Sequence, residues 1–334
     1  MTILIISHSK DVECTPMVVE AIQARGGATL CLNTDKFPSE EQVIFGNHQS
    51  PCLINQQGAH DLRTVSAVWN RRMRVGTDLA ALLDQEYLAP SIDEATRTLL
   101  GFLGTTPAFV LDPVINVSSA GNKLLQLQLA RGLGLTVPNT LITSDAEAVT
   151  HFAEANQDSV IAKMQAGFKV FRGGREHGIF TNTLSREDLA DLSGLELCPM
   201  MFQASIPKKL ELRVIVVGHQ VYAAGVDSSA NPETKEDWRR NGRALKDQWQ
   251  PFSLPAEVER GLLLLMDKLF LNYGAIDLIL TPDDRYIFLE VNPVGEFFWL
   301  DRYAGFNISA GLAALLLGKA QRRHTDLYPR PWGA

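Results

Sequence analysis

Three oxygen-bearing side chains near the C-terminal end have the types and spacing of a metal site. Asp277 lies inside the apolar run YGAIDLIL, while Glu290 and Asn292 flank Val291 in the run YIFLEVNP. Residues two apart on a strand point to the same face, so Glu290 and Asn292 face together. Carboxylate and amide oxygens suit Mg²⁺, which takes few protein ligands and completes its shell with phosphates and water.

A solvent-facing β-hairpin is the alternative for this stretch. In that case the polar residues simply face water and bind nothing. Carboxylates seldom interrupt such apolar strands unless they are paired or metal-bound. The pattern therefore favours two strands that carry a Mg²⁺ site, with Asp277, Glu290 and Asn292 as its ligands.

The same stretch resembles the metal-binding signature of ATP-grasp ligases. Two further segments, WNRRM at 69–73 and LNTDKFP at 32–38, add to LEVNPVGEFFWL at 289–300. Together they are similar to the ATP-grasp maturases that install side-chain macrocycles in ribosomal peptides, the microviridin-type or graspetide synthetases. The resemblance runs from Thr2 to about Gly318.

This resemblance implies a mixed α/β and α+β architecture, the ATP-grasp fold. It implies an N-terminal α/β pre-grasp domain at 1–112, a central ATP-grasp subdomain at 113–204 with a hairpin and a leader-binding helix, and a C-terminal catalytic subdomain at 205–334 with the Mg/ATP site. The chain itself supports the first domain, because a strand at 3–6, a helix at 16–25 and strands at 28–32 and 65–69 read as an α/β unit. A helix-rich stretch is expected at 79–103, a hairpin at 165–183 and a polar lid at 229–250.

ATP is the implied nucleotide. In the family, two lysines hold its phosphates, and Lys123 and Lys163 stand at the matching places. A lysine that ends a buried strand is otherwise often a snorkelling surface residue. The segment from Met201 to Ile206 resembles the strand-to-linker hinge that holds adenine, although an ordinary core strand is the open alternative. The nucleotide-binding residues implied are Lys123, Lys163, Met201, Gln203, Ala204, Ser205, Ile206, Lys208 and Glu211.

Arginines are the implied catalytic residues, together with Lys163. Arg213 interrupts the apolar strand ELRVIV and demands a partner. In the family the corresponding arginine faces the transferred phosphoryl group, where it neutralises charge on the equatorial oxygens. Arg239 and Arg243 fall in the expected lid, which by resemblance closes over the γ-phosphate and the substrate carboxylate.

Peptide recognition is assigned to two charged clusters. In the family, an α-helical leader segment docks beside an acidic helix start, and the acidic positions here are Glu187, Asp188 and Asp191. Acids are also favourable at any helix N-terminus, so simple capping is the alternative. Arg71 and Arg72 suit carboxylate recognition because the guanidinium binds in a bidentate manner.

The implied reaction is an ADP-forming ligation. An Asp or Glu side chain of a precursor peptide attacks the γ-phosphoryl group and becomes an acyl phosphate. A Ser or Thr hydroxyl of the core then closes an ester macrocycle, which the ending PVGEFFWL favours. The alternatives are a lactam closed by Lys, an amino-acid ligase acting on a peptide C-terminus, and a non-catalytic binding module. Intact Asp277, Glu290 and Asn292 argue against the last.

Composition narrows the classes of protein to which this chain can belong. The 334 residues carry a net charge of −7 with a pI near 5.6, which argues against general nucleic-acid binding. No apolar run reaches membrane-spanning length, and the chain opens on a strand rather than a signal peptide. Four cysteines without CxxC spacing predict reduced thiols in a cytoplasmic protein. A homodimer is expected from the family and the long apolar helices.

Overall fold

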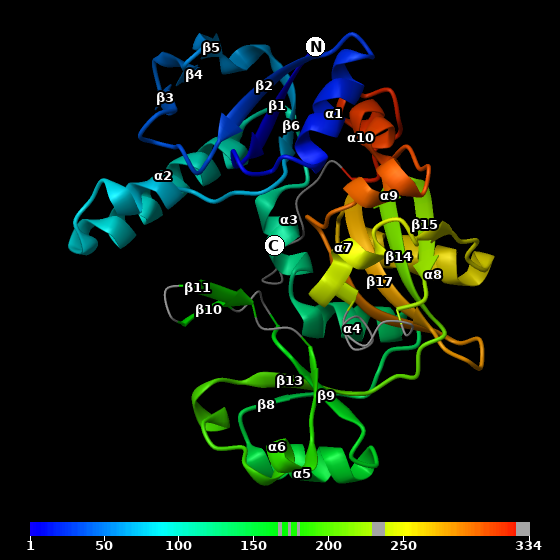
Figure 1. Cartoon of the computed structure of the whole chain (residues 1–334). Coiled ribbons are helices and arrows are strands. Elements are labelled where there is room, and N and C mark those ends of the chain that lie inside the picture. The colour runs from blue at the N-terminus through cyan, green and yellow to red at the C-terminus, as the bar shows by residue number, and fades with distance from the viewer. Residues whose placement is uncertain (166–168, 173–174, 179–180, 229–237, 325–334) are drawn as a thin grey trace, which may run out of the picture.

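The computed structural model describes residues 1–165, 169–172, 175–178, 181–228 and 238–324 (Figure 1). Its N-terminal part is built on a parallel sheet of order β2-β1-β6-β7. The strands are β1 (Thr2–Ser7), β2 (Ala28–Asn33), β6 (Val65–Asn70) and β7 (Phe109–Leu111), and the helices are α1 (Cys14–Gln23) and α2 (Gln85–Thr105). The α/β unit expected at the start of the chain is therefore confirmed.

Two features of this part differ from the sequence expectation. The helix-rich stretch is divided, because Asp84 has an extended backbone between the short 3-10 helix η2 (Thr77–Ala81) and α2. A small antiparallel sheet was not predicted at all. It comprises β3 (Gln42–Gly46), β4 (Gln49–Asn55) and β5 (Gly58–Asp61), followed by the 3-10 helix η1 (Leu62–Thr64).

The central part contains an antiparallel sheet of order β12-β9-β13-β8. Its strands are β8 (Thr140–Thr143), β9 (Val160–Lys163), β12 (Asn182–Thr183) and β13 (Met200–Ala204). It is accompanied by α5 (Ala146–Ala155), α6 (Arg186–Ala190) and the 3-10 helix η3 (Leu195–Leu197). Strands β10 (Lys169–Arg172) and β11 (Arg175–Gly178) form the expected hairpin.

The C-terminal part is built on an antiparallel sheet of order β16-β15-β14-β17-β18. The strands are β14 (Leu210–Val217), β15 (Gln220–Val226), β16 (Gln250–Pro251), β17 (Tyr273–Leu280) and β18 (Tyr286–Asn292). The accompanying helices are α7 (Gly242–Leu245), α8 (Ala256–Lys268), α9 (Phe298–Tyr303), α10 (Ile308–Leu316) and the 3-10 helix η4 (Trp238–Asn241). The two strands predicted around Asp277 and Glu290 are thus confirmed as the adjacent strands β17 and β18.

Two hydrophobic cores cover the two faces of this C-terminal sheet. One face packs against α8 and against α4 (Lys123–Gly132), which follows α3 (Val114–Ala120). The other face packs against α9, α10 and α1 of the N-terminal part, and α1 lies beside α10 in Figure 1. Buried residues of the first 22 positions, including Ile5 and Val18, therefore share one core with Ile215 and Leu312. Within the described residues, no helix combines the length and apolar character needed to cross a bilayer.

Candidate active site

The register of the C-terminal sheet aligns the predicted chemistry across three strands. Arg213 on β14 lies opposite Asp277 on β17, and Asp277 lies opposite Glu290 on β18. Asn292 lies opposite Ala275, two residues before Asp277. Since directly opposed residues share a face and residues two apart on a strand also do, these polar side chains project from the same face of the sheet.

Cations and carboxylates are paired on this face. The Arg213 Nη1 atom donates to Asp277 Oδ1 at 2.8 Å, and Lys123 Nζ contacts Glu290 Oε2. The side chains of Asp277 and Glu290 remain 15% and 14% exposed, whereas that of Arg213 is 6% exposed. The carboxylates are therefore not sealed in the core, and a ligand can approach them between their two cations.

This donor set fits the Mg²⁺ ion that the sequence suggests. Asn292 Oδ1 accepts a hydrogen bond from the Val294 N–H at 3.0 Å and keeps a second lone pair. Two carboxylates and an amide on neighbouring strands are hard oxygen ligands of the kind Mg²⁺ takes. Across the described part of the chain no group of three His, Cys, Asp or Glu side chains could hold a metal. A site with three protein ligands at this place would therefore include the Asn292 oxygen, and the metal-binding roles of Asp277, Glu290 and Asn292 stay predictions.

Helix α4 brings Lys123 to this face. Asn122 caps the helix by accepting from the Leu125 N–H at 3.0 Å. Gln126 then fixes the helix to the sheet edge, because its Oε1 accepts from the Val291 N–H and its Nε2 donates to the Val291 carbonyl, both at 2.8 Å. Its amide thus pairs with the β18 backbone as another strand would. Sequence reasoning missed Gln126, although a glutamine beside the buried Leu127 was the available signal.

An aromatic ring lies over the guanidinium of Arg213, because the Arg213 Cζ atom is 5.7 Å from the centroid of the Trp299 ring. Trp238 lies 5.3 Å from Trp299 and 5.2 Å from Trp249, again between ring centroids. Trp238 begins η4, within the expected lid, and therefore packs on the ring that lies over Arg213. The positions of Arg239 and Arg243 lie in η4 and α7, and their side chains fall outside what the structure describes.

Arg71 and Arg72 follow β6 and reach the loop after β18. Arg71 is 1% exposed and its Nη2 atom donates to Glu296 Oε2 at 2.7 Å. Arg72 contacts the other carboxylate oxygen of Glu296, and its Nη2 atom donates to the Val294 carbonyl at 3.1 Å. The Arg71 guanidinium thus contacts the protein itself, and its direct binding of substrate stays a prediction. Arg72 is partly exposed, and its role in substrate binding stays a prediction.

Two of the expected adenine-binding residues have buried side chains. Met201 is fully buried, and Gln203 is 1% exposed and donates through Nε2 to Thr140 Oγ1 at 2.9 Å. Both lie on β13, which pairs with β8 on one side and β9 on the other. Contacts of Met201 and Gln203 with adenine stay predictions.

The other expected nucleotide residues lie at the ends of strands and are partly exposed. The N–H groups of Ala204 and Ser205 donate to the Asn139 carbonyl at 3.0 Å and the Ser159 carbonyl at 2.8 Å. Beyond them, Ile206 is partly exposed and leads towards Lys208. Contacts of Ala204, Ser205 and Ile206 with adenine stay predictions.

Three further residues complete the expected nucleotide-binding set: Glu211, Lys208 and Lys163. Lys208 Nζ lies 2.8 Å from Glu211 Oε1, which also accepts from Ser228 Oγ at 2.7 Å. Burial raises the pKa of Glu211 despite the lysine beside it. Glu211 shares the sheet face of Arg213, two residues along β14. Lys163 ends β9, opposite Met201, and is partly exposed. The nucleotide roles of Lys163, Lys208 and Glu211 stay predictions.

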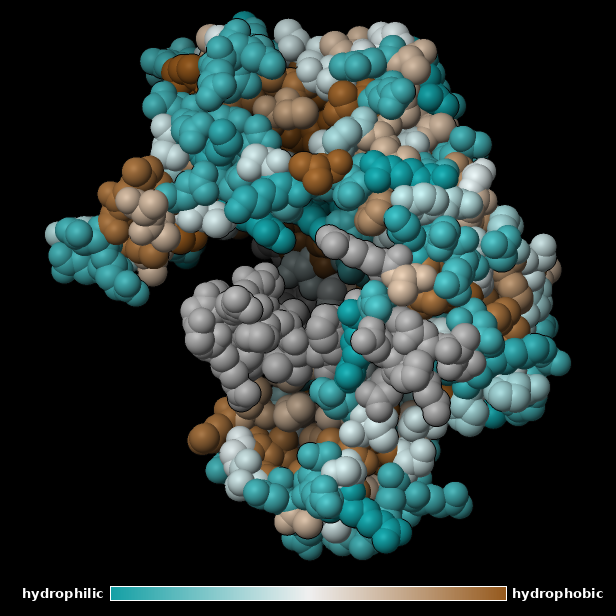
Figure 2. Space-filling model, viewed as in Figure 1, coloured by the Kyte–Doolittle hydropathy of each residue, from teal (hydrophilic) through white to brown (hydrophobic). Residues whose placement is uncertain are grey.

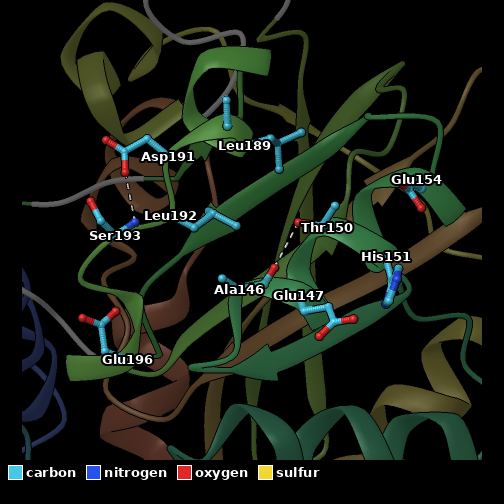
Figure 3. A pocket seen from close by; sticks show the side chains of 11 residues that line it. Ala146, Glu147, Thr150, His151, Glu154, Leu189, Asp191, Leu192, Ser193 and Glu196 are labelled. Carbon is cyan, nitrogen blue, oxygen red and sulfur yellow. Dashed lines mark hydrogen bonds between the residues drawn. The ribbon is translucent and has the colours of Figure 1, made fainter.

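The acidic cluster lies at α6 and is solvent-exposed. Asp188 accepts from the Ser185 N–H at 2.8 Å and the two side chains form a capping box, which lowers the pKa of Asp188. Asp191 accepts from the Ser193 N–H at 3.1 Å, as Figure 3 shows. Glu187 is exposed on the same helix. Capping therefore explains Asp188, and Glu187, also in the first turn of α6, is favourable at the helix N-terminus.

A pocket of about 640 Å³ adjoins this cluster, between α5 and the segment after α6 (Figure 3). Carboxylates from both sides line it: Glu147 and Glu154 from α5, and Asp191 and Glu196 from the facing segment. The surface beside α6 is therefore negative, and it can attract a cationic peptide side chain.

Comparison with known proteins decides the family. Residues 2–118 match the model of the MvdD pre-ATP grasp domain, and residues 120–316 match that of the RimK-like ATP-grasp domain. The chain is an ATP-grasp ligase of the graspetide maturase family. No curated protein sequence matches the chain.

Solved structures of similar proteins agree with this assignment. Macrocyclase MdnC from Microcystis aeruginosa MRC, bound with precursor peptide MdnA, is 41% identical with a TM-score of 0.87, covering 95% of this chain and 100% of its own. A Chryseobacterium gregarium RiPP-associated ATP-grasp ligase, in complex with ADP and a leader and core peptide, is 36% identical with a TM-score of 0.91, covering 97% and 98%. Macrocyclase MdnB from Microcystis aeruginosa MRC is 34% identical with a TM-score of 0.78, covering 95% and 99%. The maturase therefore matches these enzymes over nearly its whole length.

Proposed function

We propose that this maturase uses ATP to convert Asp or Glu side chains of a ribosomal precursor peptide into acyl phosphates and closes ester macrocycles with Ser or Thr. The observation that carries the proposal is the shared sheet face on which Arg213, Asp277, Glu290 and Asn292 project, with Lys123 paired to Glu290. The similar MdnC and Chryseobacterium gregarium structures contain precursor, leader or core peptides. ATP and newly made peptides meet in the cytoplasm, where we place the reaction.

The first step transfers the γ-phosphoryl group of ATP to a peptide carboxylate, and ADP leaves. Arg213 is placed to stabilise the charge that develops on the transferred group, while Lys123 and Lys163 bind the nucleotide phosphates. Mg²⁺, held by Asp277, Glu290 and Asn292, would neutralise phosphate charge. We assign Arg239 and Arg243 of η4 and α7 to closing the site from the lid side.

In the second step the peptide hydroxyl attacks the acyl carbon, its proton is lost, and phosphate departs. The maturase contributes mainly by holding the two peptide groups together and away from water. If a Lys amine attacks instead, the same site closes a lactam. The choice between ester and amide therefore depends on which nucleophile the core peptide offers near the acyl phosphate.

Incubation of the maturase with ATP, Mg²⁺ and its precursor peptide tests the proposal. We expect one ADP and the loss of one water from the peptide for each ring, measured by mass spectrometry. Mild alkaline hydrolysis should reopen ester rings and leave amide rings closed. Addition of a free amino acid to the peptide C-terminus, or no mass change at all, would contradict macrocyclisation.

We place the leader helix of the precursor beside α6. The exposed Glu187 and Asp191 and the negative pocket next to them suit a leader arginine through charge-assisted pairs. We expect charge reversal at Glu187, Asp188 and Asp191 to weaken leader binding about tenfold and to leave ATP affinity unchanged. Isothermal titration of the leader peptide and of nucleotide measures both.

A matched control separates leader binding from helix capping. Glu257 is an exposed acid in the first turn of α8, so Glu257→Lys makes the same change at a helix start remote from α6. We expect it to leave leader affinity unchanged. Asp188→Asn, by contrast, weakens the capping box alone. Wild-type leader affinity in a Glu187→Lys, Asp191→Lys variant would show that the acids serve only the helix.

We also propose that the maturase is a homodimer. Large apolar side chains are exposed along α2 and the segment before it: Leu82 is 65% exposed and Tyr87 is 58% exposed. Brown atoms over α2 are visible in Figure 2. A second copy would cover this surface. Light scattering at micromolar concentration should give twice the monomer mass, and Leu82→Glu should lower it. A monomer mass for the wild-type protein would contradict the proposal.

A further inference from the structure

Glu296, in the loop between β18 and α9, is held at both its ends. Its main-chain carbonyl accepts from Arg213 Nη2 at 3.1 Å. Its carboxylate accepts from Arg71 Nη2 at 2.7 Å and contacts Arg72. One residue thus joins the arginine of the sheet face to two arginines of the N-terminal part.

The carboxylate end is fixed by buried donors. Cys14 Sγ on α1 lies 2.8 Å from Glu296 Oε2, the oxygen that Arg71 also contacts. Burial raises the pKa of the Cys14 thiol to about 12, so the thiol keeps its proton and donates. Arg71 Nε lies 3.3 Å from Asp11 Oδ2, which holds the other side of the guanidinium.

The main-chain carbonyl of the preceding residue, Gly295, is also held by hydrogen bonds from side chains. Its carbonyl accepts from Tyr273 Oη at 2.8 Å and from Arg71 Nη1 at 3.1 Å. A Cβ atom at Gly295 would lie 2.3 Å from the Ala275 Cβ and 2.7 Å from Arg213 Nη2. The loop backbone is therefore packed directly against the guanidinium of Arg213, and glycine is required for that approach.

We propose that Arg71 is a positioning residue for Arg213. Arg71 holds the loop through Gly295 and Glu296, and the loop holds Arg213 through the Glu296 carbonyl and through direct packing at Gly295. The N-terminal domain then takes part in setting the geometry of phosphoryl transfer without touching the substrate. The inference rests on the catalytic role proposed for Arg213.

General loosening of the two domains is the competing explanation for any effect of Arg71. A second ion pair between them allows a control, because Arg302 of α9 lies 2.5 Å from Glu13 Oε2, just before α1. Both side chains are 41% exposed, and Arg302 packs over Phe298 rather than over Arg213. The double variant Glu13→Gln, Arg302→Met therefore removes a contact between domains and leaves the loop intact.

The first test is the rate of ADP formation with saturating ATP and precursor peptide. We expect Arg71→Met to lower kcat about 100-fold, the loss typical of misplacing a reacting group by about 1 Å, with the KM for ATP little changed. Arg71→Lys keeps a charge for Glu296 but cannot contact Gly295 as well, so it should retain intermediate activity. The Glu13→Gln, Arg302→Met control should keep wild-type kcat. Equal losses in the control and in Arg71→Met would overturn the proposal.

A double-mutant cycle distinguishes positioning from direct substrate contact. In an Arg213→Lys background the group that Arg71 positions is already altered, so Arg71→Lys should lower the rate much less than it does in the wild type. Multiplicative losses would mean that Arg71 acts independently of Arg213, and would overturn the proposal.

Crystal structures of the Arg71→Lys and Arg71→Met variants provide a readout that needs no peptide. We expect the Glu296 carbonyl to move away from Arg213 and the guanidinium to shift relative to Asp277. An unmoved Arg213 in a folded variant would overturn the inference whatever the kinetics. If the wild-type protein released no ADP with any precursor, the proposed function would fail while these structures still decided the positioning role.

Discussion

Alanine at Asp277, Glu290 or Asn292 is expected to lower ADP and product formation by about 10³-fold or more, because each change removes a proposed oxygen ligand for Mg²⁺ from the phosphoryl-transfer step. The three side chains project from one face of β17 and β18, beside Arg213 and Lys123. Asp277 and Glu290 are partly exposed, so their loss leaves no large cavity, and the fold should persist.

Rates measured against Mg²⁺ concentration test this directly. The variants should need more Mg²⁺ for whatever rate remains, and a chelator should abolish wild-type activity. Asp283→Ala is the matched control, because Asp283 lies in the turn between the same strands and its side chain is 61% exposed. It should behave as wild type. Unchanged ADP release in any of the three variants would remove that residue from the metal site.

Arg213→Ala is expected to lower kcat by about 10³-fold while ATP still binds, since an arginine that meets charge developing in the transition state contributes little to ground-state affinity. The guanidinium is 6% exposed and contacts Asp277, the Glu296 carbonyl and the Trp299 ring. Arg213→Lys keeps the charge but loses the two-armed geometry, so an intermediate rate is expected.

Nucleotide affinity and turnover must be measured on the same Arg213 preparation. Titration calorimetry with ATP should give a dissociation constant close to that of the wild-type protein. ADP production with precursor peptide should fall sharply, and thermal unfolding should show a folded protein. Wild-type turnover in Arg213→Ala would show that Arg213 is only structural, and a parallel loss of ATP affinity would place it in ground-state binding.

Much of the fold and part of the candidate site could be read from local pattern. The alternation of YIFLEVNP was enough to place Glu290 and Asn292 on one face, because side chains on a strand repeat every two residues. Local pattern also predicted the opening α/β unit, the hairpin at β10 and β11 and the acidic start of α6. Capping by Asp188 was a stated alternative for its charge, and the structure contains that capping box.

The sequence pattern could not show which helix or strand packs against a given face or edge of another element. Met201 and Gln203 lie on a strand whose sequence also suits a hinge, and only the pairing of β13 with both β8 and β9 buries them. Gln126 was missed for the same reason, since its partner is the backbone of Val291 on a distant strand. Local sequence indicates the face of a strand or helix from which a side chain projects, whereas long-range packing determines which group that side chain contacts.

The sequence by itself determined the chemical groups of the site and the strands that carry them. Only the tertiary structure decided which groups Arg71 contacts. Its position after β6 suggested a substrate contact, yet its guanidinium is buried against Glu296, more than two hundred residues along the chain. That meeting follows from the core in which α1 packs against α10 and the C-terminal sheet. A buried guanidinium must find carboxylate and carbonyl partners, and chain topology, rather than local periodicity, determines which ones lie within reach.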